Sequence, residues 1–376
     1  MSAYIIAARR TAVAPREGAF RGVEPYDLAV PLIRAVLADA AVAPEEVDDV
    51  ILGNALYAGG NPARMAALAA GLPDHVPALT VDTQCSAGLD AILLAAARIN
   101  AGEADLVIAG GLESFSRAPL RFVRPRGPDE TPREYARPSF SPFSDRDPDL
   151  IAAAAQLAGE LGISRQQQEA FAIESHRKAL EDNNPHAIVE LAGLARDAFT
   201  RALDPRLCAR LPVLEGDPEH GVTAATVAVE ADAAAIVLVA SEKMASRVSL
   251  AVRVLGGARR GGATEQPSLV PVDAAKAVLA RAGRRAGEVS AEIMEAFAVQ
   301  AIAGIQGIGL DPSKVNMRGG ALARGHPIGA SGAILCVHLF AQAKAAPPGG
   351  FSAGGFLGLA AIAAAGGLGS ALLLGD

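Results

Sequence analysis

Aromatic residues and cysteines are scarce in this sequence. The 376 residues include no tryptophan, aromatic residues make up 4%, and the cysteines are Cys85, Cys208 and Cys336. An odd number of widely spaced cysteines does not form a disulfide framework, and it lacks the ligand spacing of a zinc site. We therefore expect a protein without a bound metal that works in a reducing, cytoplasmic compartment.

Positive charge is not in excess either. The 34 lysine and arginine residues are outnumbered by 41 acidic residues, which gives a net charge of -7 and a pI near 5.5. This composition argues against nucleic acid as a partner, because such proteins carry a basic surface. The N-terminal apolar stretch is short and runs into Arg9 and Arg10, so we expect no signal peptide.

The longest uncharged segment runs from Phe351 to Leu374 and is long enough to raise the possibility of a membrane span. Glycines interrupt it, including the pairs Gly354-Gly355 and Gly366-Gly367. We therefore expect two short buried strands joined by a turn, and no contact with a membrane.

An internal duplication organises the rest of the chain, of which 51% is hydrophobic. Similar segments recur in the two halves: Leu37–Ala40 and Leu279–Ala282, Glu24–Ala29 and Val270–Ala275, Ala91–Leu93 and Ala333–Leu335. In each half an apolar strand, a helix, a second strand and another helix follow one another. Alternating strands and helices predict a mixed sheet with helices on its faces, and two such halves predict a pseudo-twofold pair of domains with a cleft between them.

The predicted boundaries follow from this duplication. We assign residues 1–116 with 222–243 to an N-terminal half, 117–221 to an inserted loop domain, and 244–376 to a C-terminal half. Within the loop domain a polar helix is expected from Ser164 to Asp182, with Ser164 as its N-cap. In the C-terminal half the apolar run Ile293–Val299 is expected to form a strand.

The segment from Arg324 to Gly332 reads RGHPIGASG and places one imidazole, His326, among glycines and small residues. The unperturbed pKa of histidine suits proton transfer near neutral pH, so His326 is a candidate general base. The alternative is a glycine-rich turn whose histidine is merely solvated.

A second segment supplies a candidate nucleophile, Cys85, between a predicted strand at 79–82 and a predicted helix at 87–100. The positive end of a helix favours a thiolate, and the residues after the cysteine, Ser86, Ala87 and Gly88, are small enough to leave room for a ligand. The alternative is a buried structural cysteine. By the offset of the duplication, Gln84 falls opposite His326, so both helix N-termini should meet at one cleft.

These motifs together resemble the thiolase family over essentially the whole chain. The resemblance rests on the sequences CSAGLDA from Cys85, GGLESFS from Gly110, EAFA from Glu295, GHPIGASG from Gly325 and GGLG from Gly366. It implies a duplicated five-layered αβαβα fold, a homodimer or homotetramer, and acyl-CoA chemistry without a further cofactor. It also implies that Cys85 accepts the acyl group, that His326 activates Cys85, and that the backbone N–H groups of Cys85 and Ala365 form an oxyanion hole.

Three positions depart from the family pattern. Met294 stands where thiolases carry an asparagine that positions a water molecule, and a thioether cannot donate a hydrogen bond. Ala363 stands where thiolases carry a second cysteine, the acid and base for the α-carbon proton in Claisen condensation. Ala228 stands where a serine contacts the pantetheine arm of CoA.

We therefore predict a thiolase-like acyltransferase that forms an acyl-Cys85 thioester, with an impaired Claisen step. The donor is an acyl-CoA or another acyl thioester, such as one on an acyl carrier protein. One alternative is a non-catalytic subunit that binds acyl thioesters or depends on an accessory protein. Another is a thioesterase-like variant in which water intercepts the acyl-enzyme.

Overall fold

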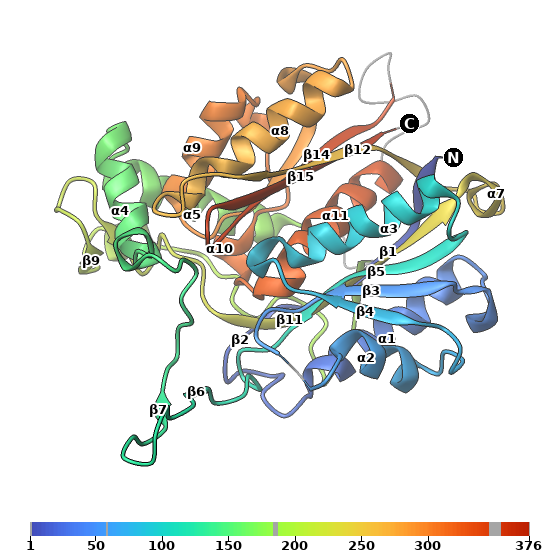
Figure 1. The fold of residues 1–376 in the computed structure, drawn as a ribbon. Helices are drawn as coiled ribbons and strands as arrows, with labels where there is room; N and C mark the ends of the chain where they lie inside the picture. The colour runs from blue at the N-terminus through green and yellow to red at the C-terminus, as the bar shows by residue number, and fades with distance from the viewer. Residues whose placement is uncertain (1, 58, 183–186, 346–354, 376) are drawn as a thin grey trace.

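The computed structural model describes residues 2–57, 59–182, 187–345 and 355–375. Five layers follow one another in the order α, β, α, β, α, and Figure 1 shows them edge-on. The two outer layers are helical: α1 (Pro25–Asp39) and α2 (Pro62–Ala70) on one side, α8 (Val270–Arg281) and α9 (Ala298–Ile308) on the other. The predicted duplicated αβαβα architecture is thereby confirmed.

Five strands form the N-terminal sheet. Their order is β1 (Ala3–Thr11), β11 (Ala231–Ser241), β5 (Leu106–Glu113), β3 (Asp49–Gly53) and β4 (Ala78–Val81). The first two pairings are antiparallel and the next two are parallel. β11 follows the inserted loop region in the sequence, yet it pairs between the two strands β1 and β5, which precede that region.

The C-terminal sheet repeats this pattern. Its order is β12 (Val252–Gly261), β15 (Leu368–Gly375), β14 (Leu357–Ala364) and β13 (Ser290–Ile293). Two antiparallel pairings are again followed by a parallel one. A short pairing of β1 with β12 joins the two sheets edge to edge. The segments that resemble each other in sequence thus occupy equivalent places in two copies of one topology.

The period of two in a strand explains how each sheet separates two helical layers. Along β14, Leu359 and Ala361 pack with the outer helices α8 and α9, whereas Ala360 and Ile362 face the middle layer. Every one of these side chains is buried. Strands that are apolar on both faces are expected when helices cover both sides of a sheet.

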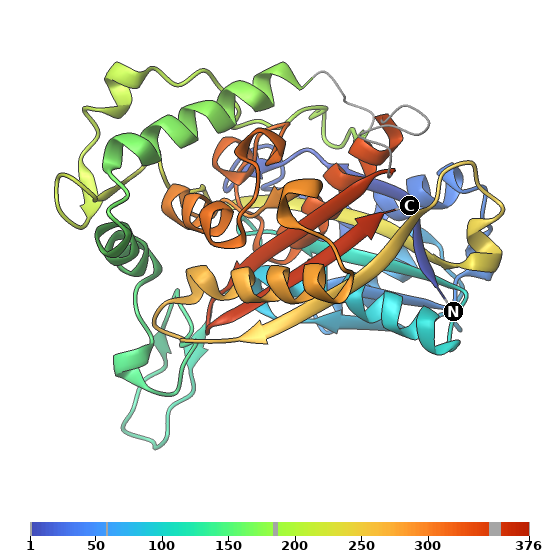
Figure 2. The same cartoon turned by 90° about the horizontal axis from the view of Figure 1, so that it is seen from above.

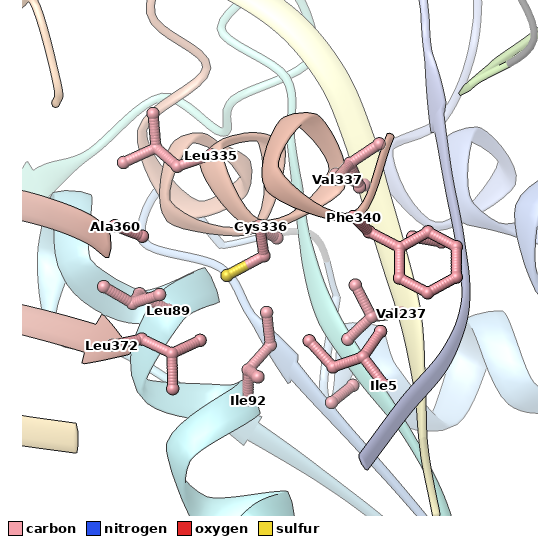
Figure 3. Packing of buried hydrophobic residues seen from close by; sticks show 14 of the residues in the cluster. Ile5, Leu89, Ile92, Val237, Leu335, Cys336, Val337, Phe340, Ala360 and Leu372 are labelled. Carbon is pink, nitrogen blue, oxygen red and sulfur yellow. The ribbon is translucent and has the colours of Figure 1, made fainter. Parts of the chain in front are cut away.

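The middle layer consists of α3 (Ala87–Ala101) and α11 (Ile328–Ala345). Figure 3 shows Cys336 of α11 pointing into a core formed with Ile92 of α3 and with strand residues such as Val237 and Leu372. α11 is long and apolar enough to cross a membrane, but 78% of it is buried inside the protein. Its position between two sheets accounts for its apolar composition, since every side of the helix contacts protein.

The inserted region carries α4 (Leu150–Leu161), α5 (Arg165–Glu181) and the short α6 (Pro205–Cys208). Its strands have two or three residues each: β6 (Phe122–Val123), β7 (Arg133–Glu134), β8 (Ile188–Val189) and β9 (Val213–Glu215). β9 pairs with β10 (Val222–Thr223), which directly follows the region. Ser164 caps α5 by accepting a hydrogen bond from the amide of Gln167, as predicted. Figure 2 shows these helices along one side of the C-terminal half, with the β6–β7 hairpin projecting from the molecule.

Of two expectations about the C-terminal half, one was wrong and the other is confirmed. The predicted strand Ile293–Val299 was wrong, because it overlaps β13 only at Ile293, and α9 begins at Ala298. Short apolar runs do not distinguish a strand from the start of a buried helix. The predicted hairpin near the C-terminus is present as β14 and β15, which are antiparallel; residues 351–354 of the predicted segment lie outside the described residues.

Candidate active site

Cys85 lies in a 3-10 turn, Gln84–Ser86, between β4 and α3, which agrees with the predicted strand and helix on either side. Gln84 adopts a left-handed conformation with φ of 55°, an unusual one for a residue other than glycine. The side chain of Asp82 stabilises this turn, because its Oδ1 accepts hydrogen bonds from the amide and the side chain of Gln84. The sharp turn leaves Cys85 partly exposed, whereas Cys208 and Cys336 are buried.

His326 lies between the short helix α10 (Ala321–Arg324) and α11. Gly325 directly before it has a φ of +113°, and a Cβ there would lie 2.8 Å from that of Ala231. Only glycine fits this position without strain. The amide of His326 donates to the carbonyl of Val229 at 2.8 Å, which fixes the loop against the segment leading into β11.

The two candidate residues meet: His326 Nε2 and Cys85 Sγ are 3.2 Å apart. Burial raises the pKa of the Cys85 thiol to about 12, and the amides of Ala365 and Cys85 offset only part of that increase. Burial also lowers the pKa of His326 to about 4. The expected thiolate is therefore not the resting form; the pair consists of a protonated thiol and a neutral imidazole that is placed to accept its proton.

Ser331 orients the imidazole, a role that the sequence reasoning did not assign. Its Oγ lies 2.7 Å from Nδ1 of His326, and its side chain is buried. The tautomer that donates Nδ1–H to Ser331 leaves the lone pair of Nε2 facing the thiol. Ser331 belongs to the GHPIGASG segment, so a hydroxyl in the first turn of the helix after His326 was the available signal.

Two backbone amides reach the sulfur from opposite halves of the molecule. The N–H groups of Cys85 and Ala365 each interact with the Cys85 thiol and lower its pKa. Ala365 belongs to the tight turn between β14 and β15. Two amides beside one nucleophile can stabilise the oxygen of a tetrahedral intermediate, and the oxyanion hole of Cys85 and Ala365 stays a prediction.

The small residues after Cys85 make room for a helix, and the expectation that they leave room for a ligand was wrong. A Cβ on Gly88 would lie 2.6 Å from the carbonyl oxygen of Gly329, and one on Gly111 would lie 2.0 Å from the same atom. Gly332 is equally close to Leu89. α3 and α11 therefore cross backbone against backbone, and this contact brings Cys85 and His326 together.

Glu113 is a buried carboxylate that joins the two halves beneath the site. It accepts hydrogen bonds from the side chain of Asn54 and from the amides of Ala55, Leu56 and Gly329. Burial raises its pKa to about 7, although three of these amides act in the opposite direction. In the sequence Glu113 is only one residue of the GGLESFS motif, and no role is predicted for it there.

Comparisons with known proteins agree with this geometry. Residues 3–190 match the family model of the thiolase N-terminal domain, and residues 248–376 match that of the thiolase C-terminal domain. The Bacillus subtilis protein named "Putative acetyl-CoA C-acetyltransferase YhfS" is 38% identical and is covered over 99% of each chain. VraB of Staphylococcus aureus strain MRSA252, named in the same way, is 35% identical over 90% of this chain and 92% of its own.

A solved structure gives the same result. The crystal structure of the Bacillus anthracis acetyl-CoA acetyltransferase superimposes with a TM-score of 0.89 at 29% identity, covering 100% of this chain and 98% of that one. The chain belongs to the thiolase family. It is accordingly a thiolase-type acyltransferase.

Two of the positions that depart from the thiolase pattern are apolar and buried. Met294, directly after β13, packs in the central core, and its amide donates to Ala361. Ala363 lies near the end of β14, opposite Gly369. Neither side chain can donate or accept a proton.

Ala228, the third such position, lies on the stretch that runs between the loop region and β11. Its amide donates to the carbonyl of Ala296, and its neighbour Val229 accepts from the amide of His326. Ala228 is partly exposed beside the His326 loop. It offers a methyl group where the family serine offers a hydroxyl.

Two other titratable residues close to the site in sequence are directed elsewhere. Glu295 is buried and bonds Ser175, Asn316 and the amide of Leu322, which holds the loop before α10. His338 is buried two turns along α11 from Ser331 and contacts Glu292 at 3.3 Å. Within the described ranges, no group of three or more histidine, cysteine or acidic residues could hold a metal ion.

Proposed function

We propose that this thiolase transfers an acyl group from an acyl-CoA by way of a thioester on Cys85. The observation that supports this proposal is the 3.2 Å contact between His326 Nε2 and Cys85 Sγ, with Ser331 on the far side of the ring. A thiol, a neutral base and a group that orients the base make up an activated nucleophile. CoA enters as part of the substrate, and no further cofactor is needed for this step.

In the acylation step His326 removes the thiol proton as Cys85 Sγ attacks the thioester carbonyl. The carbonyl oxygen gains negative charge, and the amides of Cys85 and Ala365 stabilise it. When the tetrahedral intermediate collapses, the bond to the CoA sulfur breaks and His326 returns its proton to that sulfur. The products are acyl-Cys85 and free CoA.

We further propose that carbon–carbon bond formation is slow in this protein. Claisen condensation requires removal of a proton from the α-carbon of the second substrate. Met294 and Ala363 occupy the two positions that would manage this step, and neither side chain can exchange a proton. Loss of one proton-transfer group costs about 10² to 10⁴ in rate, so the acyl group is expected to persist on Cys85 or to pass to another acceptor.

The first test is the intact mass of the protein after incubation with acyl-CoAs of different chain length. We expect an adduct of one acyl group that peptide mapping assigns to Cys85, and no adduct with Cys85→Ala. Cys208→Ala is the matched control, because it removes a buried thiol on α6 in the inserted region, and it should be acylated normally. Wild-type protein without any adduct would refute acyl transfer and favour a binding subunit.

The second test identifies the acceptor. Candidate acceptors, including acetyl-CoA, free CoA, amines and alcohols, are added to the isolated acyl-enzyme, and the decay of the adduct is followed. Release of free acid in buffer alone, abolished by Cys85→Ala, would favour the thioesterase-like alternative. Decay only in the presence of a co-purifying protein would favour a partner-dependent subunit.

We also propose that the protein is a cytoplasmic homodimer. The three cysteines are unpaired, which fits a reducing compartment. β4 forms one end of the sheet and leaves Leu79 half exposed. An exposed apolar edge strand offers unpaired N–H and C=O groups with which another chain can pair. Light scattering coupled to size-exclusion chromatography tests this, and a monomeric mass at micromolar concentration would overturn it.

A further inference from the structure

Asp90 is a buried carboxylate close to the nucleophile that the proposed chemistry does not use. It lies in the first turn of α3 and is 1% exposed. Three side chains converge on it: Thr83 Oγ1 at 2.7 Å, Ser370 Oγ at 2.6 Å and Arg259 Nε at 3.0 Å. The two hydroxyls come from opposite halves of the molecule, so the carboxylate joins those halves.

One end of this connection is the turn that carries Cys85. Thr83 directly precedes that turn, and its carbonyl accepts the amide of Ser86 at 3.2 Å. Its hydroxyl donates to Asp90 Oδ2. The start of α3 and the strand before it are therefore fixed to each other around the nucleophile, and a shift of Thr83 would move the amide of Cys85.

The other end is the hairpin that carries the second amide. Ser370 is the third residue of β15 and pairs with Ile362 on β14. The turn between these two strands holds Ala365, whose amide interacts with the Cys85 sulfur. Asp90 thus connects the segments that supply the two amides of the proposed oxyanion hole.

We propose that Asp90 is a positioning residue, which sets the spacing between the N–H groups of Cys85 and Ala365 at the reacting carbonyl. This inference rests on the proposed acyl transfer through Cys85. The site favours a carboxylate because both hydroxyls and the guanidinium of Arg259 act as donors, and an ionised carboxylate is an acceptor only. An asparagine has the same shape, but it loses the charge that pairs with Arg259, and its amide N–H must find a hydroxyl that turns to accept it.

The test compares Asp90→Asn with wild type in single-turnover acylation by a short acyl-CoA. We expect the acylation rate constant to fall about 10- to 100-fold, since small misplacements of reacting groups cost rate on this order. The dissociation constant of the acyl-CoA should change little, because Asp90 does not contact the substrate. Thr83→Val should reduce the rate in the same direction, and Thr83→Ser, which retains the hydroxyl, should restore it.

Asp49→Asn is the matched control. Asp49 is also buried and pairs with a partly exposed arginine, Arg98, at the opposite end of α3. The Asp49→Asn substitution should lower the melting temperature without slowing the acylation of the folded protein. If Asp90→Asn slows acylation no more than Asp49→Asn does, or if Thr83→Val acylates at the wild-type rate, the inference is wrong. The absence of any adduct on wild-type Cys85 would instead refute the proposed function itself.

Discussion

The residues at the two sets of positions that the thiolase resemblance assigns to the active site differ sharply in polarity. On the acylation side, Cys85, His326 and Ser331 form a continuous set of hydrogen-bonding groups, with two backbone amides at the sulfur. At the positions that the resemblance assigns to the α-carbon, which we call the apolar side, Met294 and Ala363 are buried and apolar. Both sets of residues belong to the same five-layered fold.

This difference separates two functions that the thiolase fold usually combines. The polar side needs a nucleophile, a base and an oxyanion site, and each of these is held by contacts between the two halves. The apolar side still packs well, because methionine fills irregular spaces in a core. Under the proposed function, the fold would retain thioester exchange without the groups for condensation, because apolar side chains fill their positions.

The largest effect is expected at the base. Replacing His326 with alanine removes the acceptor of the thiol proton, while burial still raises the pKa of Cys85 to about 12. We predict that the acylation rate at neutral pH falls about 10² to 10⁴-fold, as is typical when a general base is removed. Rapid-quench mass spectrometry of acyl-Cys85 measures this rate. A loss of less than tenfold would show that the acylation side works without its base.

The pH profile tests the same residue in the wild-type protein. Burial lowers the pKa of His326 to about 4, so its imidazole stays neutral and active from neutral pH down to about that value. The acylation rate should be level near neutrality and fall only as the pH approaches 4. In the unfolded chain histidine protonates near pH 6.5, so the contribution of His326 to stability is lost as the pH falls from 6.5 towards 4. His326→Gln should weaken that loss.

An intermediate effect, on the rate of condensation, is expected when a thiol is introduced on the apolar side. Ala363→Cys returns a proton donor and acceptor to the position that thiolases use for the α-carbon. We predict that acetoacetyl-CoA formation from acetyl-CoA rises about 10- to 100-fold, with a further gain when Met294→Asn is added. Product formation is followed by the absorbance of the enolate or by chromatography.

The control for this gain is Ala364→Cys, a thiol one residue further along β14. Successive side chains of a strand point to opposite faces, so this cysteine is directed away from the position of Ala363. It should leave the condensation rate unchanged, and Cys85→Ala should abolish any gain. Wild-type protein that already condenses acetyl-CoA as fast as the double variant would contradict the functional separation of the two sides.

The framework of the site could be predicted from sequence, because it follows from the duplication. The offset that relates Ala91–Leu93 to Ala333–Leu335 also placed Gln84 opposite His326, and the structure brings their neighbourhoods together. The supporting contacts could not be predicted in this way. Glu113 reaches Gly329, and Asp90 reaches Ser370, only after the two halves have packed. Sequence spacing gives no information about such long-range pairs.

The glycines near Cys85 show a second limit of prediction from sequence. A small residue beside a nucleophile is consistent with either an open pocket or a close backbone contact, and sequence alone does not distinguish them. Here α11 fills the space beside Gly88 and Gly111. At Gly159, inside α4, a Cβ would meet no atom within 4 Å, so the same residue type has no such role there.

The smallest effect is expected from this helix crossing. Gly111→Ala would put a methyl group 2.0 Å from the carbonyl oxygen of Gly329, so α11 must shift away from β5. We predict a loss of about 1 to 3 kcal/mol in the free energy of unfolding, as for other overpacked cores. Gly159→Ala, in an open helical position, should instead gain about 0.5 to 1 kcal/mol. Chemical denaturation measures both. Because α11 begins just after His326, Gly111→Ala should also slow acylation, and an unaltered rate in a destabilised protein would show that the crossing does not set the distance from His326 to Cys85.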